Sequence, residues 1–207
     1  MNRLEQLTKL FEISSIKRLD PEAKRPLQVQ SNEHDCNYGI MTGIEHNLTV
    51  IDIDNSPDKK GSKWLKKYAD FKPDKECIFL VQTPHGFHYY FKHSQLLGGT
   101  KHYNKIGIDI QSGNSYVVAP YSIVRCDKDW CANYGQLEGY KLIKDNSHLG
   151  KGNIPSTTIL FHLLEKTRKL KKSRKPKKKD KSVNKAIWNS KLSKVTRREV
   201  YGKEKHK

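Results

Sequence analysis

The 207-residue sequence has no run of apolar residues that approaches the length of a membrane-spanning helix. It has only four cysteines, at positions 36, 77, 126 and 131, and their irregular spacing does not indicate a disulfide framework. The first residues also lack the pattern of a secretory signal peptide. We therefore expect free thiols, a reducing intracellular compartment (cytoplasm or nucleus) and no membrane partner.

Acidic residues are scarce, since 22 Asp and Glu stand against 40 Lys and Arg, which gives a net charge of +18. The imbalance is local: residues 151–207 hold 20 of the basic residues and four of the acidic ones. Residues 1–150 consequently carry +2 and residues 151–207 carry +16. The sequence therefore predicts a nearly neutral domain in residues 1–150, followed by a polycationic segment suited to a polyanionic partner.

The apolar pattern of residues 1–150 predicts an α+β domain, with a mixed sheet that carries helices on one face. Helices are expected over residues 2–13 and from Ser62 to a point before Pro73. The expected strands span residues 37–41, 48–54, 77–81, 87–91, 106–110 and 116–119. We expect the last four of these strands to form two hairpins, each around a glycine-containing turn.

Acidic and imidazole groups occur in three of these strands. Because strand side chains alternate, Asp52 and Asp54 share one face with Val50. Two carboxylates so close repel each other unless a cation lies between them, and Mg²⁺ and Mn²⁺ prefer such oxygen ligands. Asp109 lies in another apolar strand, and His88 follows a glycine turn, where it is placed to bond a phosphate oxygen. The set predicts a divalent-metal site for nucleotidyl transfer, in which paired ions stabilise the attacking and leaving oxygens.

Each feature alone has an ordinary explanation. A D-x-D pair in a strand occurs often by chance, and a single histidine among aromatic residues is more often a packed residue than a ligand. Three acids in one sheet are costly to bury without a cation, however, and this favours a common site.

The order and spacing of these segments resemble the bifunctional primase–polymerase (prim-pol) domain of the archaeo-eukaryotic primase superfamily. The resemblance covers about residues 10–145 and rests on NYGIMTG at 37–43, VIDID at 50–54, TPHGFHYY at 83–90, and DIQ with VVAPYS at 109–111 and 117–122. Gly86 departs from the wider superfamily, which often has serine there, so a hydroxyl contact is lost or replaced. The prim-pol domain also usually precedes a helicase, and none follows here.

The resemblance implies an RRM-like catalytic subdomain joined to a smaller N-terminal α/β unit, with the active site between them. It further implies that Asp52, Asp54 and Asp109 are catalytic and hold two Mg²⁺ or Mn²⁺ ions, while His88 contacts the phosphates of the incoming nucleotide. The expected partners are a single-stranded DNA template, dNTP or NTP substrates, and a replicative helicase supplied in trans or missing from this sequence.

Two further segments are ambiguous. Lys24 and Arg25 lie where the family has a basic K-x-P loop, and either contact phosphate or template or form an ordinary solvated loop. The aromatic residues 89–91 either stack on bases or pack in the core. Alternation places Tyr90 on the face of His88.

Cys126 and Cys131 resemble half of a zinc site, for which Cys36, Cys77 or His102 would be partners. Their C-x4-C spacing lacks the usual C-x2-C pairs, so we expect ordinary thiols rather than zinc. Mg²⁺ or Mn²⁺ is therefore the cofactor that the sequence favours.

The basic segment predicts a docking helix over residues 151–170 and a mostly disordered tail over residues 171–207. Polycationic tails bind nucleic-acid backbones by counterion release, although a nuclear-import signal and a solubilising tail are alternatives. The candidate contact residues in the tail are Arg174, Lys175, Lys177, Lys178 and Lys179.

The leading hypothesis is a metal-dependent, template-directed DNA primase/polymerase. One alternative is a non-catalytic replication adaptor that binds single-stranded nucleic acid. Another is a D-x-D glycosyltransferase, in which the +16 tail would have no role.

Overall fold

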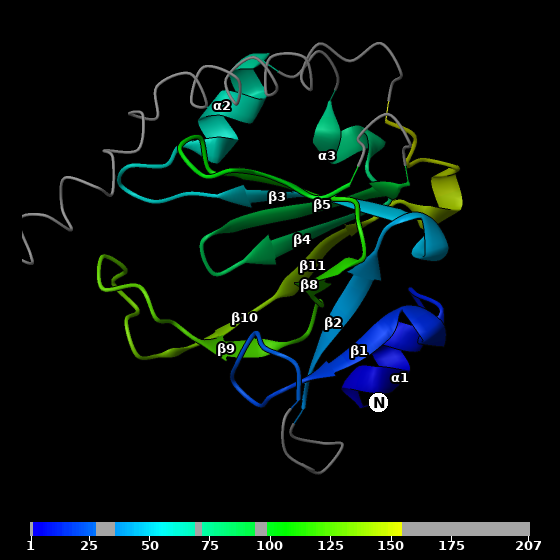
Figure 1. Cartoon of the computed structure of the whole chain (residues 1–207), viewed down its shortest axis with the longest axis horizontal. Helices are drawn as coiled ribbons and strands as arrows, with labels where there is room; N and C mark the ends of the chain where they lie inside the picture. Colours follow the sequence, from blue (N-terminus) through cyan, green and yellow to red (C-terminus); the bar gives the residue numbers. More distant parts are fainter. Residues whose placement is uncertain (1, 28–35, 69–71, 94–98, 155–207) are drawn as a thin grey trace, which may run out of the picture. The chain divides into compact units, whose positions relative to one another are not determined.

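A computed structural model describes residues 2–27, 36–68, 72–93 and 99–154 of the chain (Figure 1). The chain divides into two units, residues 1–166 and 167–207, and every described residue lies in the first. The predicted docking helix beyond residue 154 and the tail, with its basic residues 174–179, lie outside the described residues.

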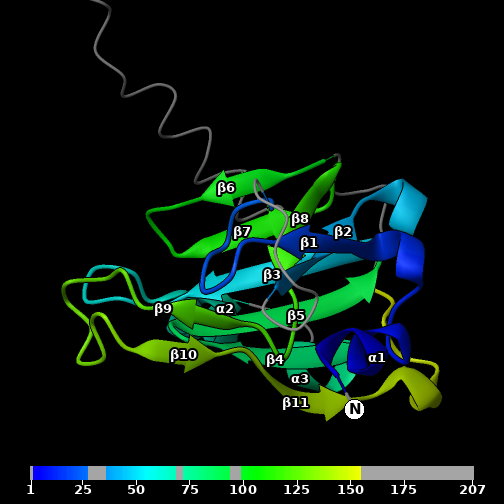
Figure 2. The ribbon, with the colours of Figure 1, turned by 90° about the horizontal axis from the view of Figure 1, so that it is seen from below.

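The main element of the described part is a six-stranded sheet with the strand order β11-β4-β5-β3-β7-β6. Its strands are β3 (Leu48–Asp54), β4 (Phe79–Thr83), β5 (Gly86–Lys92), β6 (Lys101–Tyr103), β7 (Ile108–Gln111) and β11 (Lys141–Asp145). Figure 2 shows β6 at one edge of this sheet and β11 at the other.

All neighbouring strands of this sheet are antiparallel, so the prediction of a mixed sheet was wrong. Strands β3 and β4 run in the same direction, but β5 folds back between them and pairs with both. The turn that joins β4 to β5 is the predicted hairpin, which is confirmed by the pairing of Thr83 with Gly86.

One face of the sheet is covered by the helices α2 (Gly61–Tyr68) and α3 (Pro73–Glu76), as Figure 1 shows. The apolar cluster on this side includes Ile51, Ile53 and Leu65. Alternation along β3 thus works as predicted, because the two isoleucines point away from the face of the carboxylates.

The opposite face packs against a second, three-stranded sheet of β1 (Ile16–Leu19), β2 (Asn37–Thr42) and β8 (Ser115–Val118). The apolar cluster between them contains Val50, Val81 and Tyr90 from the main sheet and Leu19 and Ile40 from the smaller one. Val50 is therefore fully buried although it shares a face with Asp52. The described residues agree with the α+β class.

Helix α1 (Arg3–Thr8) is shorter than the predicted helix over residues 2–13. It begins at a capping box in which Asn2 and Glu5 satisfy each other's backbone N–H groups. The chain then leaves the helix so that the ring of Phe11 can pack on Phe79 and Tyr90, at centroid distances of 5.0 and 5.6 Å. Tertiary packing here outweighs the helical spacing of the apolar residues.

The predicted hairpin between residues 106–110 and 116–119 is also wrong. Strand β7 pairs with β3 and β6, whereas β8 pairs with β2 in the smaller sheet. The chain crosses between the sheets at Gly113, whose backbone N–H donates to Thr100 Oγ1 and whose carbonyl oxygen accepts from Thr42 Oγ1.

The remaining elements of the described residues are short. A hairpin of β9 (Ile123–Arg125) and β10 (Leu137–Gly139) follows the smaller sheet. Single 3₁₀ turns are found at Ile13–Ser15, Ile44–His46 and Ser147–Leu149. No helix within the described ranges is both long and apolar enough to cross a membrane.

Candidate active site

Asp52 lies in the middle of a row of polar side chains that crosses neighbouring strands of the main sheet. In the strand register, Asp52 of β3 is opposite His88 of β5 on one side and Asp109 of β7 on the other. Asp109 is in turn opposite His102 of β6. Directly opposed residues present their side chains on one face, and Asp54 joins that face two residues further along β3. The structure thus brings together the three carboxylates and the histidine that the sequence singled out.

Asp52 is the carboxyl group with the strongest electrostatic perturbation in this row. Its side chain keeps 26% of its surface exposed. Burial, together with the charges of Asp54 and Asp109, raises the pKa of Asp52 from 3.8 to about 8, against the opposing effect of Lys24 and Lys59. Without a cation, Asp52 therefore holds a proton at neutral pH.

This set of groups fits a divalent cation. Carboxylate oxygens are the hard ligands that Mg²⁺ and Mn²⁺ take, and a cation would offset the burial and the carboxylate repulsion that together raise the pKa of Asp52. The residues that would hold it are Asp52 and Asp54, with Asp109 across the strand pair.

Asp54 is the most accessible of the three, with 49% of its side-chain surface exposed at the end of β3. Its carboxylate lies 3.5 Å from Nζ of Lys59, and its backbone N–H donates to the carbonyl oxygen of Gly107 at 2.8 Å. The end of β3 is thereby held between β7 and β5, and Gly86 lets the backbone of β5 come close to that of β3. A Cβ on Gly86 would overlap the carbonyl oxygen of Ile53. Serine cannot replace this glycine without moving the two strands apart.

Asp109 already has two partners on the side of β6. Its Oδ2 lies 2.9 Å from Nδ1 of His102, and its Oδ1 accepts a hydrogen bond from the backbone N–H of Tyr103 at 3.1 Å. Each carboxylate oxygen has a second lone pair, so these contacts orient Asp109 without exhausting its capacity as a ligand.

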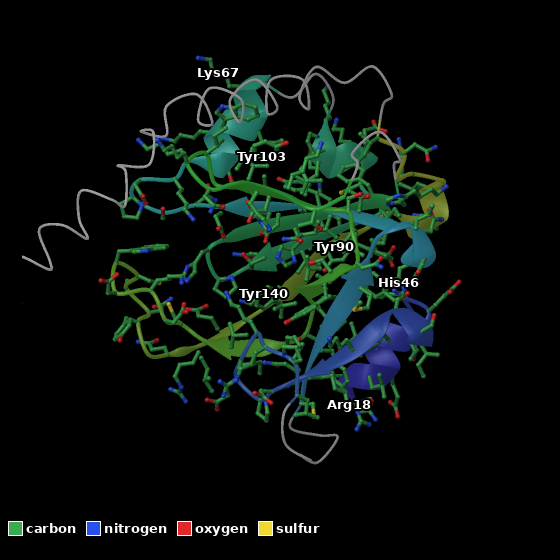
Figure 3. The ribbon with its side chains drawn as sticks, in the orientation of Figure 1. Arg18, His46, Lys67, Tyr90, Tyr103 and Tyr140 are labelled. Atoms are coloured by element: carbon green, nitrogen blue, oxygen red, sulfur yellow. The ribbon has the colours of Figure 1, made fainter. Side chains whose placement is uncertain are left out.

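His88 is almost fully buried beside Asp52, with Nε2 3.4 Å from the Asp52 Oδ1 atom. Its ring lies 6.1 Å from that of Tyr90 and 5.6 Å from that of Tyr140, two buried residues labelled in Figure 3. Burial, with a smaller effect of Lys24, lowers the pKa of His88 to about 3. The imidazole is therefore neutral, and its Nδ1 has no hydrogen-bond partner among the described residues.

A cleft of about 530 Å³ opens over Asp52, Asp54 and His88, between the main sheet and β8, while Asp109 lies next to Asp52 outside its lining. Three lysines from separate loops line it together with Asp52, Asp54 and His88; they are Lys24, Lys59 and Lys128. Carboxylates with neutral imidazole on one wall and ammonium groups around them suit a ligand that carries both metal ions and phosphates.

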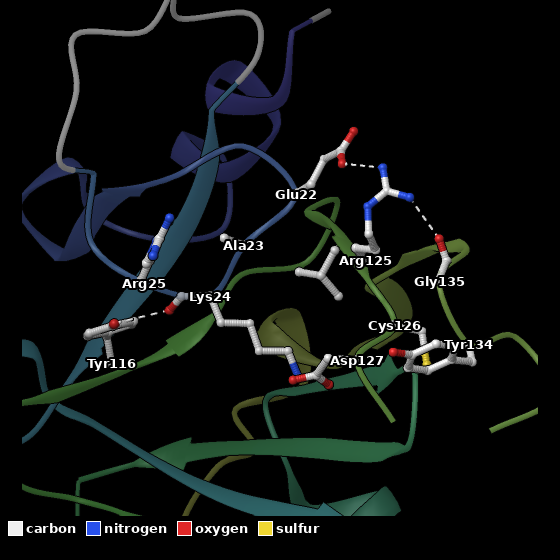
Figure 4. Close-up of a pocket in the computed structure, with 11 residues that line it drawn as sticks. Glu22, Ala23, Lys24, Arg25, Tyr116, Arg125, Cys126, Asp127, Tyr134 and Gly135 are labelled. Atoms are coloured by element: carbon white, nitrogen blue, oxygen red, sulfur yellow. Dashed lines mark hydrogen bonds and ion pairs between the residues drawn. The ribbon is translucent and has the colours of Figure 1, made fainter. Parts of the chain in front are cut away.

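A second cleft, of about 680 Å³, adjoins the first and shares Lys24 and Tyr116 with it (Figure 4). Its wall is fixed by Arg125, which bonds Glu22 and the carbonyl oxygen of Gly135, both at 2.7 Å. Arg25 also lines this cleft, although its Nε donates to Asp20 at 2.7 Å.

The aromatic residues of β5 belong to the core. Tyr90 and Phe91 are fully buried, on opposite faces of the sheet, and Tyr89 packs with the helix-side cluster. This arrangement leaves Tyr90 and Phe91 no surface for stacking on bases.

Several residues of the site carry no signal in the sequence. Lys59 and Lys128 are single lysines in loops and carry no distinguishing pattern, and Tyr140 comes from a distant segment. His102 could be connected with Asp109 only through the three-residue strand β6, which is too short to predict.

Comparison with known proteins identifies the family. The Prim-Pol family model, described as "Bifunctional DNA primase/polymerase, N-terminal", matches residues 6–141, which is well over half of the chain. A search of curated proteins found no match. The matched region contains Asp52, Asp54, His88, Asp109 and the cleft around them. The chain therefore belongs to the Prim-Pol family of bifunctional DNA primase/polymerase N-terminal domains.

Proposed function

We propose that the protein is a metal-dependent nucleotidyltransferase that copies a single-stranded DNA template, starting from a primer or from a first nucleotide. The observation that carries this proposal is the row His88–Asp52–Asp109 in the strand register, with Asp52, Asp54 and His88 lining a cleft that three lysines also line. The family match favours this function over a glycosyltransferase.

The carboxylates hold the reacting groups in place. We assign Asp52, Asp54 and Asp109 as ligands of Mg²⁺ or Mn²⁺; when bound, these ions neutralise the triphosphate and make the attacking hydroxyl more acidic. His102 and the backbone of Tyr103 keep Asp109 oriented toward the site. Such support matters because phosphoryl chemistry depends mainly on positioning and charge stabilisation.

We assign the phosphates of the incoming nucleotide to the lysines that line the same cleft as the carboxylates. Lys24, Lys59 and Lys128 extend from three separate loops that line the cleft, so they surround the ligand with positive charge. His88, which is neutral, donates a single N–H to a phosphate oxygen from the cleft floor.

The template strand is assigned to the adjoining cleft. Lys24 supplies positive charge there, whereas Arg125 is paired with Glu22, and Tyr134, with 63% of its surface exposed, provides a ring on which a base can stack. The +16 segment adds affinity for the DNA backbone by counterion release, and we propose that a helicase acts in trans.

The test is incorporation of labelled dNTP with Mn²⁺ or Mg²⁺ on primed and unprimed single-stranded templates. We expect Asp52→Asn and Asp109→Asn to lose incorporation while they retain DNA binding. Asp74→Asn is the matched control, because Asp74 lies on α3 over the opposite face of the sheet. Extension at a near-normal rate by either site variant contradicts the proposal. DNA binding without incorporation by the wild-type protein would instead favour the adaptor.

A further inference from the structure

A pocket lies on the helix-covered face of the main sheet, away from the two clefts. Its volume is about 490 Å³, which is in the range of ligand sites. Phe87 and Tyr89 of β5 line it from the sheet, and Leu65 of α2 and Pro73 of α3 line it from the helices. Because side chains alternate along β5, these two rings point away from His88, which lines the cleft. The sheet therefore separates this helix-side pocket from the candidate active site.

The two aromatic rings of the helix-side pocket keep part of their surface accessible. Phe87 and Tyr89 are each half-buried, in contrast to the fully buried Tyr90 and Phe91. Their ring centroids are 6.3 Å apart, and the ring planes are inclined at 47°. An accessible aromatic ring is a surface on which a nucleic-acid base of any sequence can stack. Tyr89 therefore has the free surface for base stacking that its two neighbours in the sequence lack.

Lysines lie at the mouth of the helix-side pocket. Lys66 of α2 and Lys72, which precedes α3, are exposed and line it. Helix α2 has no acidic residue, and its other lysines are exposed as well; Figure 3 shows Lys67 extending outward from it. Asp74 also lines the pocket, but its carboxylate lies 3.3 Å from the Nζ atom of Lys144. Asp74 is thus paired with β11, and the two lysines give the mouth a net positive charge.

The positive charge of the domain is concentrated on this side. Residues 58–76, which include α2 and α3, have a net charge of +3, whereas residues 1–150 as a whole carry +2. Aromatic rings beside a row of ammonium groups are the combination that binds single-stranded nucleic acid, since bases stack on the rings and the backbone follows the charge. The bases of a duplex are already stacked on one another and cannot use such rings. The occupant that fits is therefore an unpaired strand.

We propose that the helix-side pocket binds single-stranded DNA, with one base against Phe87 and Tyr89 and the adjacent phosphates on Lys66 and Lys72. This second DNA site lies on the opposite face of the sheet from the cleft to which the template is assigned. Its role, to keep an unpaired part of the strand on the protein while another part is copied, rests on the proposed function. The binding itself does not, because none of its residues belongs to the carboxylate site.

The experiment is photo-crosslinking of the full chain to an oligothymidylate of about eight nucleotides that carries one 5-iodouracil. Mass spectrometry then identifies the crosslinked residue, so that contacts with the basic segment or the clefts are told apart from this pocket. We expect a crosslink at Phe87 or Tyr89. Its yield should fall about tenfold in Tyr89→Leu, as the loss of one stacked base predicts, and persist in Tyr89→Phe, which keeps the ring. It should also persist in Asp52→Asn, because the readout needs no incorporation.

The salt dependence of this crosslink gives a second readout. Each phosphate contact to a single strand contributes about 0.7 to the slope of log affinity against log salt, so Lys66→Gln/Lys72→Gln should lower the slope by about 1.4. The matched control Lys9→Gln/Lys141→Gln removes the same charge outside this pocket and should change the slope little. Far-UV circular dichroism checks that each variant is folded.

Three results would overturn the proposal. The first is a folded wild-type chain with no crosslink at Phe87 or Tyr89, which includes the case in which the chain's own residues fill the pocket. The second is an equal change of slope in the two double lysine variants. The third is competition by duplex DNA that is as effective as competition by the unlabelled single strand.

Discussion

Replacing Asp52 by asparagine is expected to stabilise the metal-free protein increasingly as the pH rises. The folded chain raises the pKa of Asp52 from 3.8 to about 8, mainly through burial and then through Asp54 and Asp109. Between these values the folded state holds a proton that the unfolded state has released. The free energy of unfolding of the wild type therefore falls as the pH rises through this range and levels off above the folded pKa. Asparagine has no such proton to lose.

The size of the effect follows from the pKa. Each pH unit between the two values corresponds to about 1.4 kcal/mol, so the difference between variant and wild type grows by about 2 kcal/mol from pH 6 to pH 8. With a urea dependence of about 2 kcal/mol per molar, the midpoint difference grows by about 1 M. His88 behaves oppositely: its pKa is lowered to about 3, so its contribution is lost as the pH falls below its ordinary value of 6.5. Above pH 7 His88 is mostly neutral in both the folded and the unfolded state, so its contribution changes little between pH 7 and pH 8.

The assay is urea unfolding of both proteins in EDTA at pH 6, 7 and 8, repeated with Mg²⁺ or Mn²⁺. A cation at about 100 times its dissociation constant adds about 2.7 kcal/mol to the wild type, and we expect a smaller gain for the variant. A stability difference that stays constant from pH 6 to pH 8 would refute the reasoning, because Asp52 would then be ionised without a cation.

Two further substitutions test the packing around the site. Gly86→Ala is expected to lower the free energy of unfolding by about 2 kcal/mol or more, because the new Cβ overlaps the Ile53 carbonyl oxygen. Gly139→Ala is the control and is expected to be nearly neutral, because there is open space around Gly139. Equal melting temperatures for the two variants would contradict the close approach at Gly86. Tyr90→Phe is expected to stabilise the protein by about 1 kcal/mol, because the buried hydroxyl has no hydrogen-bond partner among the described residues. A clearly lower free energy of unfolding for the variant, measured in urea, would show that the hydroxyl is hydrogen-bonded.

The site was more predictable from sequence than the sheet that carries it. Alternation in β3 was enough to place Asp52 and Asp54 on one face, because a strand with a buried side admits one register. The turn at Pro84 and Gly86 was likewise predictable from its composition, since proline and glycine define such turns. Local chemistry was therefore sufficient for the three segments that matter most.

The errors come from long-range pairing. Nothing in residues 101–103 distinguishes β6 from a loop, yet this strand occupies the edge of β7 where a hairpin with β8 was expected. The position of β5 between β3 and β4 could not be predicted either, because the alternation of apolar and polar residues identifies a strand but not the strands with which it pairs. The contact of His85 with Cys126 was hidden for the same reason, because the two residues are 41 apart in sequence and become adjacent only in the fold.

The three carboxylates lie on strands that differ in how readily their hydrogen bonds open. Strand β3 is paired on both sides, whereas β7 is paired on one side with the short edge strand β6. Asp52 and Asp54 lie on β3, which is paired on both sides, so their amide hydrogens exchange only when a large part of the sheet opens. Asp109 lies next to the short edge strand β6, whose fraying releases it from both His102 and Tyr103. Two acids are thus held in a fixed frame, while the third can change its hydrogen-bond partners at low energetic cost. The side chain of Asp109 can therefore reorient without any disturbance of the central strand.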